Sequence, residues 1–195
     1  MQIDGQTQIN NQSTWAAAHD ATGASTVNDS AAERHTAYVS MGYNISRAFF
    51  LFDTSTMTDS DAITSATFSI YITGVSDQDN DGQDYLVTAA SSPASPTALS
   101  TADFDDVGST AFSDTVDISN ISTGQYTDWT LNASGRAAIN KAGITKFSQR
   151  EGHDMENSAV NVGPADTGAT GTHCPRKCLG WRTACPVFEW CCDSD

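Results

Sequence analysis

The chain has 195 residues and a formal net charge of −15, from 24 acidic and nine basic residues. A surface this acidic repels phosphate backbones, which argues against a nucleic acid partner and leaves cations and neutral ligands. One domain is the default at this length, and its core is large enough to need no disulfide or metal for stability.

The start of the chain, Met1 to Gln6, has neither a basic nor an apolar segment, so we expect no signal peptide. No apolar run approaches the ~18 residues that a membrane-spanning helix needs. We therefore expect no membrane span.

The first segments predict a weakly patterned strand over Gln2 to Ile9 and a helical turn over Trp15 to Asp20. We interpret Trp15 as a core residue that covers one end of the fold, rather than as a platform for a ligand. Ala37 to Met41 predicts a further strand, which leads into the centre of the fold.

The clearest pattern is a pair of strands in the first half of the chain. Every residue from Ala48 to Phe52 is apolar, which indicates a central strand covered on both faces. Ala66 to Thr73 alternates apolar and polar residues, as a half-buried strand does. The polar segment Asp53 to Ser65 between them is a loop. Arg47 is predicted to lie at the rim, with its charged head in water beside a carboxylate, rather than to contact a ligand.

The second half predicts three more strands, over Tyr85 to Ala89, Tyr126 to Leu131 and Ile144 to Arg150. Ser91 to Thr101 contains two prolines and is expected outside the sheets, because proline donates no ladder hydrogen bond. Asp103 to Asp117 is expected to wrap a sheet edge.

One short helix is predicted over Ala133 to Lys141, with Asn132 as its N-cap and Gly143 as the glycine that ends it. Several short strands with turn signals between them and a single short helix predict an all-β fold. The expected architecture is an antiparallel, jelly-roll-like β-sandwich.

Four segments in the same order resemble the DNRLRE domain, a module related to the disaggregatase repeat and grouped with carbohydrate-binding modules. They are Arg47 to Ser55, Ile63 to Tyr71, Leu131 to Gly135 and Gly143 to Asp154. The resemblance implies a jelly-roll-like sandwich, of the kind found on secreted, cell-surface and phage-encoded proteins and presumed to bind polysaccharide. We therefore expect a DNRLRE-like domain over residues 1–170 and a virion-associated or extracellular location.

The chain departs from the family after Asn157. Such modules usually finish with a Thr/Val-rich strand that closes a sheet, whereas Ser158 to Thr172 is small and polar. A missing last strand would leave a sheet edge exposed, with lowered stability or pairing to another chain as the consequence.

Residues 171–195 form a cysteine-rich tail that contains all five cysteines of the chain. One interpretation is a zinc site and another is disulfides with one thiol left over. The zinc interpretation lacks the tight Cys-x-x-Cys pair of known sites. We favour a third interpretation, a divergent tail that is frame-shifted, replaced or disordered, because the composition changes abruptly where the last strand should be. The zinc ligands would be Cys174, Cys178, Cys185 and either Cys191 or Cys192.

An acidic stretch after the half-buried strand has the form of half an EF-hand calcium loop, with aspartates at alternate positions and then Gly82. The other half is missing, since Thr88 stands where the loop requires a bidentate glutamate. The alternative is therefore a solvated acidic hairpin loop. If calcium binds, its carboxylate ligands are predicted to be Asp77, Asp79, Asp81 and Asp84.

A sugar site needs an aromatic ring against the C–H face of a pyranose, with amides and carboxylates nearby to bind the hydroxyls. Each aromatic residue of the predicted strands has packing within the sheet as its alternative role. The candidates for carbohydrate contact are Tyr71, Tyr85, Tyr126 and Trp129.

Catalysis would need a pair of carboxylates, or a base with a positioned partner, and the sequence offers no such pairing. His153 and Asp154 are adjacent, and neighbouring strand residues point to opposite faces, so we expect hydrogen bonding from them rather than a dyad. The sequence predicts a non-catalytic carbohydrate-binding-like module with polysaccharide as its partner. The alternative is a virion or cell-surface structural protein that assembles with other phage or surface proteins and binds no small ligand.

Overall fold

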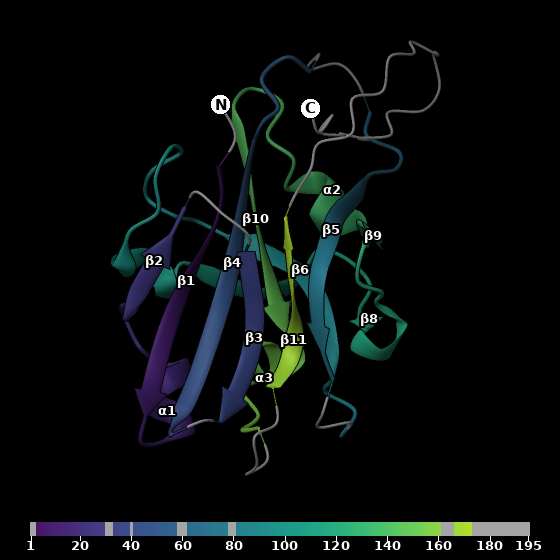
Figure 1. Ribbon diagram of the computed structural model, residues 1–195. Helices are drawn as coiled ribbons and strands as arrows, with labels where there is room; N and C mark the ends of the chain where they lie inside the picture. The colour runs from purple at the N-terminus through teal and green to yellow at the C-terminus, as the bar shows by residue number, and fades with distance from the viewer. Residues whose placement is uncertain are drawn as a thin grey trace.

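The computed structural model describes residues 3–29, 33–39, 41–57, 62–77, 81–160 and 166–172. Over these ranges the protein is all-β, with antiparallel strand pairs and short helices (Figure 1). None of the described helices combines the length and apolar character that crossing a membrane requires. The strands are β1 (Ile3–Gln12), β2 (Thr26–Asn28), β3 (Glu33–Val39), β4 (Tyr43–Asp53), β5 (Thr67–Ser76), β6 (Tyr85–Ser91), β7 (Val107–Ala111), β8 (Val116–Asp117), β9 (Gln125–Thr130), β10 (Ile144–Glu151) and β11 (Asp166–Thr172).

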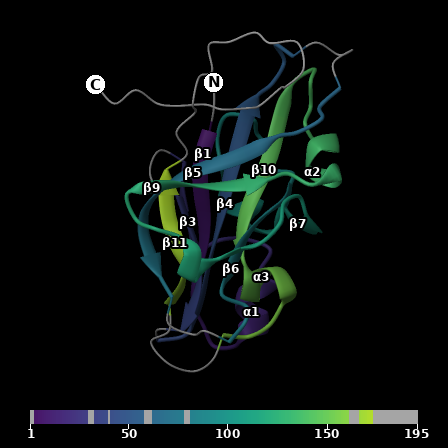
Figure 2. The same ribbon diagram turned by 90° about the vertical axis from the view of Figure 1, so that its right-hand side faces the viewer.

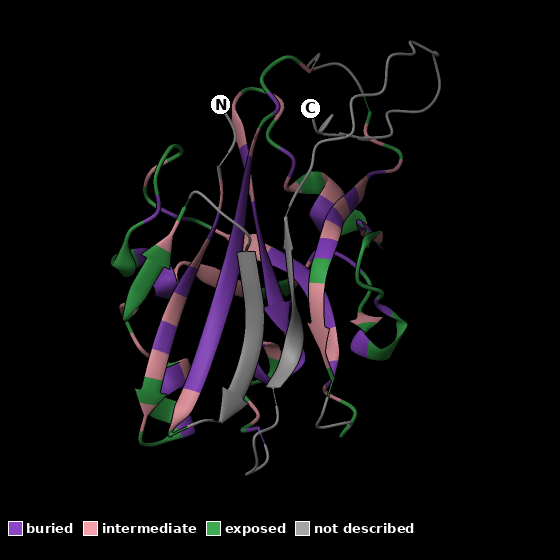
Figure 3. Ribbon diagram, in the orientation of Figure 1, coloured by how far each residue is buried: buried purple, intermediate pink, exposed green. Residues whose placement is uncertain are grey.

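Strand β4 is the centre of the fold. It pairs with β1 along one side, and on the other side with β3 near its start and with β10 near its end. Its residues from Asn44 to Leu51 are buried, which confirms the predicted central strand and extends it toward the N-terminus (Figure 3). From β10 the pairing continues through β6 to β7, and from β3 it continues through β11 and β5 to β9.

The two branches pack face to face and enclose the main core, which makes the fold a β-sandwich. Phe50 of β4 lies edge to face against Phe68 of β5, with ring centroids 4.9 Å apart, although these strands are not paired. Phe147 of β10 and Trp129 of β9 also contact the Phe68 ring. Figure 2 shows β5 and β9 passing in front of β4 and β10. The alternation predicted for β5 is confirmed, because Phe68, Ile70 and Ile72 are buried.

The expected exposed edge after Asn157 is not found. Strand β11 (Asp166–Thr172) lies between β3 and β5 and pairs with both (Figure 1). Three of its seven residues are threonine and the others are small or acidic, and a strand paired on both sides gains its hydrogen bonds from the backbone whatever its side chains. The cysteine tail, from Cys174 to Cys192, lies outside the described residues.

The described helices include the helical turn predicted over Trp15 to Asp20, the short helix predicted after Asn132, and one more that was not predicted. They are α1 (Trp15–His19), α2 (Ala133–Ala137) and α3 (Gly152–Glu156), with 3₁₀ turns η1 (Thr101–Asp105) and η2 (Ile118–Asn120). Asn132 caps α2 as predicted, by accepting a hydrogen bond from the Gly135 N–H. The helix ends at Ala137, so Gly143 does not terminate it. Trp15 packs with Ile45 and Phe104 at one end of the sandwich, which confirms its predicted role in the core.

The prediction that Arg47 lies at the rim is wrong. Its side chain is only 2% exposed, and Nη2 donates to the Asp154 carboxylate over 2.7 Å. Nη1 and Nη2 also donate to the carbonyl oxygens of Phe104 and His19. Arg150 of β10 donates from Nε to the second oxygen of Asp154 over 2.6 Å. A buried carboxylate shared by two arginines therefore joins β4, β10 and α3.

Burial alone would raise the pKa of Asp154, but the charges and hydrogen bonds of Arg47 and Arg150 outweigh it and hold the pKa well below the ordinary 3.8. Stability from this depressed pKa is present above about pH 4 and is lost as the pH falls.

We expect Asp154→Asn to lower the free energy of unfolding by ~3–5 kcal/mol at pH 7, because it leaves two buried guanidinium groups without their counter-ion. Urea denaturation measures the change, and Asp114→Asn, which removes an exposed carboxylate, serves as the control and should stay within ~0.5 kcal/mol of wild type. A loss of less than ~1 kcal/mol in Asp154→Asn would contradict the role of this ion cluster.

Candidate functional site

The outer face of the β5–β9 pair brings two of the predicted aromatic residues together. Tyr71 of β5 is the register partner of Tyr126 of β9, and Ser69 is the partner of Asp128. Since side chains alternate along a strand, these two pairs share one face, opposite the one that carries Phe68 into the core. We call the four residues Ser69, Tyr71, Tyr126 and Asp128 the tyrosine face.

The geometry of the tyrosine face combines rings with hydrogen-bonding groups. The ring centroids of Tyr71 and Tyr126 are 5.2 Å apart at an interplanar angle of 68°, an edge-to-face pair. Both rings are partly exposed. Ser69 Oγ donates to Asp128 Oδ1 over 2.5 Å, which fixes the carboxylate two residues along each strand from the rings. A partly exposed aromatic pair thus lies beside an exposed, oriented carboxylate.

The other two aromatic candidates lie elsewhere. Trp129 is 1% exposed, and its indole N–H donates to the Leu86 carbonyl within the core, so its ring is not open to a sugar. Tyr85 begins β6, and its hydroxyl donates to Glu156 Oε1 over 2.5 Å. Its ring also packs on Gly152, where an added Cβ would come within 2.8 Å of it. Tyr85 therefore belongs to the contact between β6 and α3.

The sequence alone shows that Tyr126 and Trp129 lie on opposite faces of the strand, because they are three positions apart. It does not show which of them points inward. Which of the two points inward follows from the register with β5, where Trp129 is opposite Phe68 and Tyr126 is opposite Tyr71. The Ser69–Asp128 pair was not predicted, because it also depends on the register between β5 and β9.

The predicted calcium ligands differ in their surroundings. Asp79 lies outside the described residues. Asp81 Oδ2 lies 3.3 Å from His153 Nε2, and its Oδ1 accepts from the Gln83 N–H. Asp84 is buried, and Asp77 is exposed at the end of β5. Within the described ranges, no three His, Cys, Asp or Glu side chains are grouped closely enough to hold a metal ion.

His153 and Asp154 form no dyad, as predicted, although they belong to α3 rather than to a strand. His153 Nδ1 lies 2.7 Å from Glu151 Oε1, and the Glu151 side chain also accepts from the backbone N–H groups at the start of α3. His153 is thus held between Glu151 and Asp81, while Asp154 is turned toward the two arginines. Both members of the predicted pair act by hydrogen bonding.

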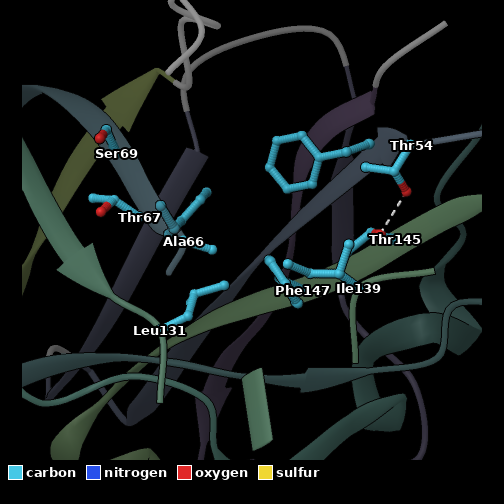
Figure 4. A pocket seen from close by; sticks show the side chains of 10 residues that line it. Thr54, Ala66, Thr67, Ser69, Leu131, Ile139, Thr145 and Phe147 are labelled. Atoms are coloured by element: carbon cyan, nitrogen blue, oxygen red, sulfur yellow. Dashed lines mark hydrogen bonds between the residues drawn. The ribbon is translucent and has the colours of Figure 1, made fainter. Parts of the chain in front are cut away.

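Two cavities lined by described residues can be compared with the tyrosine face. One is an apolar crevice of about 40 Å³ between the sheets, where Figure 4 shows Thr54 and Thr145 hydrogen-bonded over 2.7 Å at its rim. A volume near that of one water molecule is too small for a pyranose ring. The other is an open groove of about 380 Å³ beside α2, lined by residues such as Ile63, Arg136 and Lys141. Among the residues that the structure describes, no aromatic ring lines this groove, so they give it no stacking surface.

Comparison with known proteins finds no match for this chain among family models, curated protein sequences or solved structures. The resemblance to the DNRLRE domain therefore stays a prediction, and the fold defines the protein as an all-β sandwich.

The buried pair of Glu151 and His153 makes stability depend on pH. Burial raises the pKa of Glu151 from 4.5 to about 7. Burial alone would lower the pKa of His153, but the hydrogen bond and charge of Glu151, with the charge of Asp81, raise it from 6.5 to about 9. The folded pair therefore holds more protons than the unfolded chain, and its contribution is lost as the pH rises through about 9.

We expect the free energy of unfolding to fall by at least ~1.4 kcal/mol between about pH 6 and pH 9.5, because the pair must give up a proton that it binds more tightly when folded. His153→Gln removes the titrating ring and should flatten this dependence, whatever its effect on stability at a single pH. Chemical denaturation at a series of pH values measures both curves. If the free energy of unfolding changed with pH in the same way in the wild type and the variant, the pH dependence would not come from the Glu151–His153 pair.

Proposed function

We propose that this protein is a non-catalytic module that binds a polysaccharide on the tyrosine face. The observation that carries the proposal is the cross-strand pair of Tyr71 and Tyr126, two partly exposed rings 5.2 Å apart on the outer face of the β5–β9 pair. Aromatic rings give sugars a large apolar contact at a small entropic cost, because they have few rotatable bonds.

The neighbours of the two rings supply the polar part of sugar recognition. The Asp128 carboxylate is exposed, and Ser69 uses one of its acceptor sites, which leaves others for sugar hydroxyls. Because the rings stand edge to face, a pyranose that stacks on one ring lies beside the other. Contact of this kind selects by shape and by hydroxyl pattern.

The negative charge of the protein favours a neutral polysaccharide over an anionic one. With a formal net charge of −15 and a carboxylate on the binding face itself, the protein repels anionic chains at long range. A neutral polysaccharide escapes this repulsion, and its hydroxyls donate to Asp128. We therefore propose a neutral glycan, met on a virion or outside the cell, in line with the resemblance to the DNRLRE domain.

The buried positions of the two carboxyl groups with strongly shifted pKa values support a non-catalytic function. Glu151 and Asp154 are at most 1% exposed and are satisfied by protein partners. A substrate cannot reach either group without disrupting the fold. Their shifted pKa values therefore reflect structural pairing rather than a general acid or base.

We expect Tyr71→Ala and Tyr126→Ala each to weaken binding to a neutral glycan at least tenfold, a loss of ~1.4 kcal/mol, because each removes a stacking surface. Tyr71→Phe and Tyr126→Phe keep the ring and should retain most of the affinity. A glycan array identifies the ligand with the wild-type protein, and calorimetry then measures each variant against it.

Two controls locate the site. Tyr85→Phe removes the hydroxyl bonded to Glu156, and Lys141→Gln changes a residue that lines the groove beside α2. Neither residue belongs to the tyrosine face, so both variants should bind as wild type does. Loss of binding in Lys141→Gln with normal binding in the tyrosine variants would place the site in that groove. Failure of the wild-type protein to bind any neutral glycan would favour the alternative, a structural protein of a virion or cell surface.

A further inference from the structure

The outer face of the β5–β9 pair continues beyond the tyrosine face. The two strands pair without a register shift over six residues each, from Thr67 opposite Thr130 to Ile72 opposite Gln125. Because alternate residues of a strand share a face, Thr67, Thr73 and Thr130 lie on the same side as the tyrosine face. Thr67 is partly exposed, and Thr73 and Thr130 are exposed. The face that solvent reaches is therefore longer than the pair of rings.

Polar groups flank the two rings on both sides along the strands. On one side, Thr73 lies two residues beyond Tyr71. On the other side lie first the carboxylate of Asp128 and then Thr67 opposite Thr130. Successive rows of side chains are ~6.8 Å apart, because each residue of an antiparallel strand advances ~3.4 Å. This spacing is similar to the length of one pyranose unit, so neighbouring sugars of one chain can meet neighbouring rows.

The rings lie outside both cavities described above. Neither the apolar crevice nor the groove beside α2 is lined by Tyr71, Tyr126 or Asp128. Thr67 and Ser69 border the crevice, but Figure 4 shows their hydroxyl groups pointing away from it. A single terminal sugar has little surface, and a site that selects it encloses it in a pocket. A row of groups on a sheet face instead contacts a chain from one side.

We infer that the tyrosine face binds an internal segment of an extended, β-linked polysaccharide that lies along β5 and β9, and that it requires no chain end. This inference rests on the function proposed above. One sugar unit stacks on the ring pair, and the next unit donates a hydroxyl hydrogen bond to Asp128. The threonine hydroxyls both donate and accept, so they pair with the hydroxyls of the outer units.

The regular pairing of β5 with β9 favours one shape of chain. Because the pairing has no register shift, the rows follow one another in an even line. A ribbon-like chain, such as one of β-1,4-linked units, keeps successive sugars above that line. A coiled chain of α-1,4-linked units turns away from the face and leaves the outer rows unused. The polar groups on both sides of the rings likewise fit a chain that continues in both directions.

We expect affinity to rise at least about tenfold from the monosaccharide to the tetrasaccharide and then to level off, because the face offers rows for about four units. Isothermal titration calorimetry with β-1,4-linked gluco-, manno- and xylo-oligosaccharides of one to six units measures this for the wild-type protein. The best hexasaccharide should bind equally well after borohydride reduction of its end, and maltohexaose should bind at least about tenfold more weakly.

The outcomes separate this inference from the proposed function. Binding through Tyr71 that is as tight for a monosaccharide as for the hexasaccharide, or that is lost when the chain end is reduced, would overturn the inference and leave the proposed function standing. Tighter binding of maltohexaose than of every β-1,4-linked hexasaccharide would also overturn it. If the protein binds no neutral glycan at all, the proposed function fails, and the inference fails with it.

Variants of the outer rows locate the two ends of the bound segment. Thr73→Ala and Thr130→Ala should each weaken hexasaccharide binding about threefold, the value of one hydrogen bond, and leave disaccharide binding unchanged. Both positions are exposed, so the folded state tolerates these changes. Thr115→Ala, at an exposed position just before β8, is the matched control and should bind every oligosaccharide as wild type does. Unchanged hexasaccharide binding in both Thr73→Ala and Thr130→Ala would contradict a chain that spans the rows.

Discussion

The carboxylate of Asp154 is the point on which one end of the sandwich depends. It receives hydrogen bonds from Arg47 of β4 and Arg150 of β10, and Arg47 uses its remaining donors on the carbonyl oxygens of Phe104 and His19. Three charged side chains are buried there with nearly every donor satisfied, and the guanidinium of Arg47 also stacks 4.2 Å from the Phe104 ring centroid. Such a cluster tolerates little displacement, because moving one member leaves the others buried without a partner. It therefore fixes where α1, η1 and α3 meet the central strands.

Helix α3 also connects this ion cluster to the acidic stretch between β5 and β6. Helix α3 carries His153, whose ring lies between Glu151 and Asp81, and Glu156, which accepts from Tyr85 and Gln83. Gly152 allows the close approach, since an added Cβ would lie 2.1 Å from the Gln83 carbonyl oxygen. One end of the loop is thus anchored to α3 through Asp81. Asp84, which lies just beyond, is also buried, and one of its oxygens accepts from the Gly82 N–H.

The tyrosine face depends on a different part of the core. Phe68 and Trp129 are opposite each other on the inner face of β5 and β9, and burying these two large rings sets which residues of both strands point outward. Tyr71 and Tyr126 meet outside because Phe68 and Trp129 meet inside. The proposed binding surface and the core are therefore two consequences of a single register. A register shift of one residue would turn the core residues of one strand to the outer face and its outer residues to the core.

The local sequence pattern by itself determined several elements of the fold. The unbroken apolar run of β4, the alternation of β5 and the Asn132 cap were readable because each depends on neighbours in the sequence. The interior place of Arg47, the inward direction of Trp129 and the formation of β11 were not, because each depends on a partner distant in the chain. These partners are Asp154, the register with β5, and the pairing with β3 and β5. The tertiary structure alone decided which charges found a counter-ion, since burial and pairing are properties of the assembled fold.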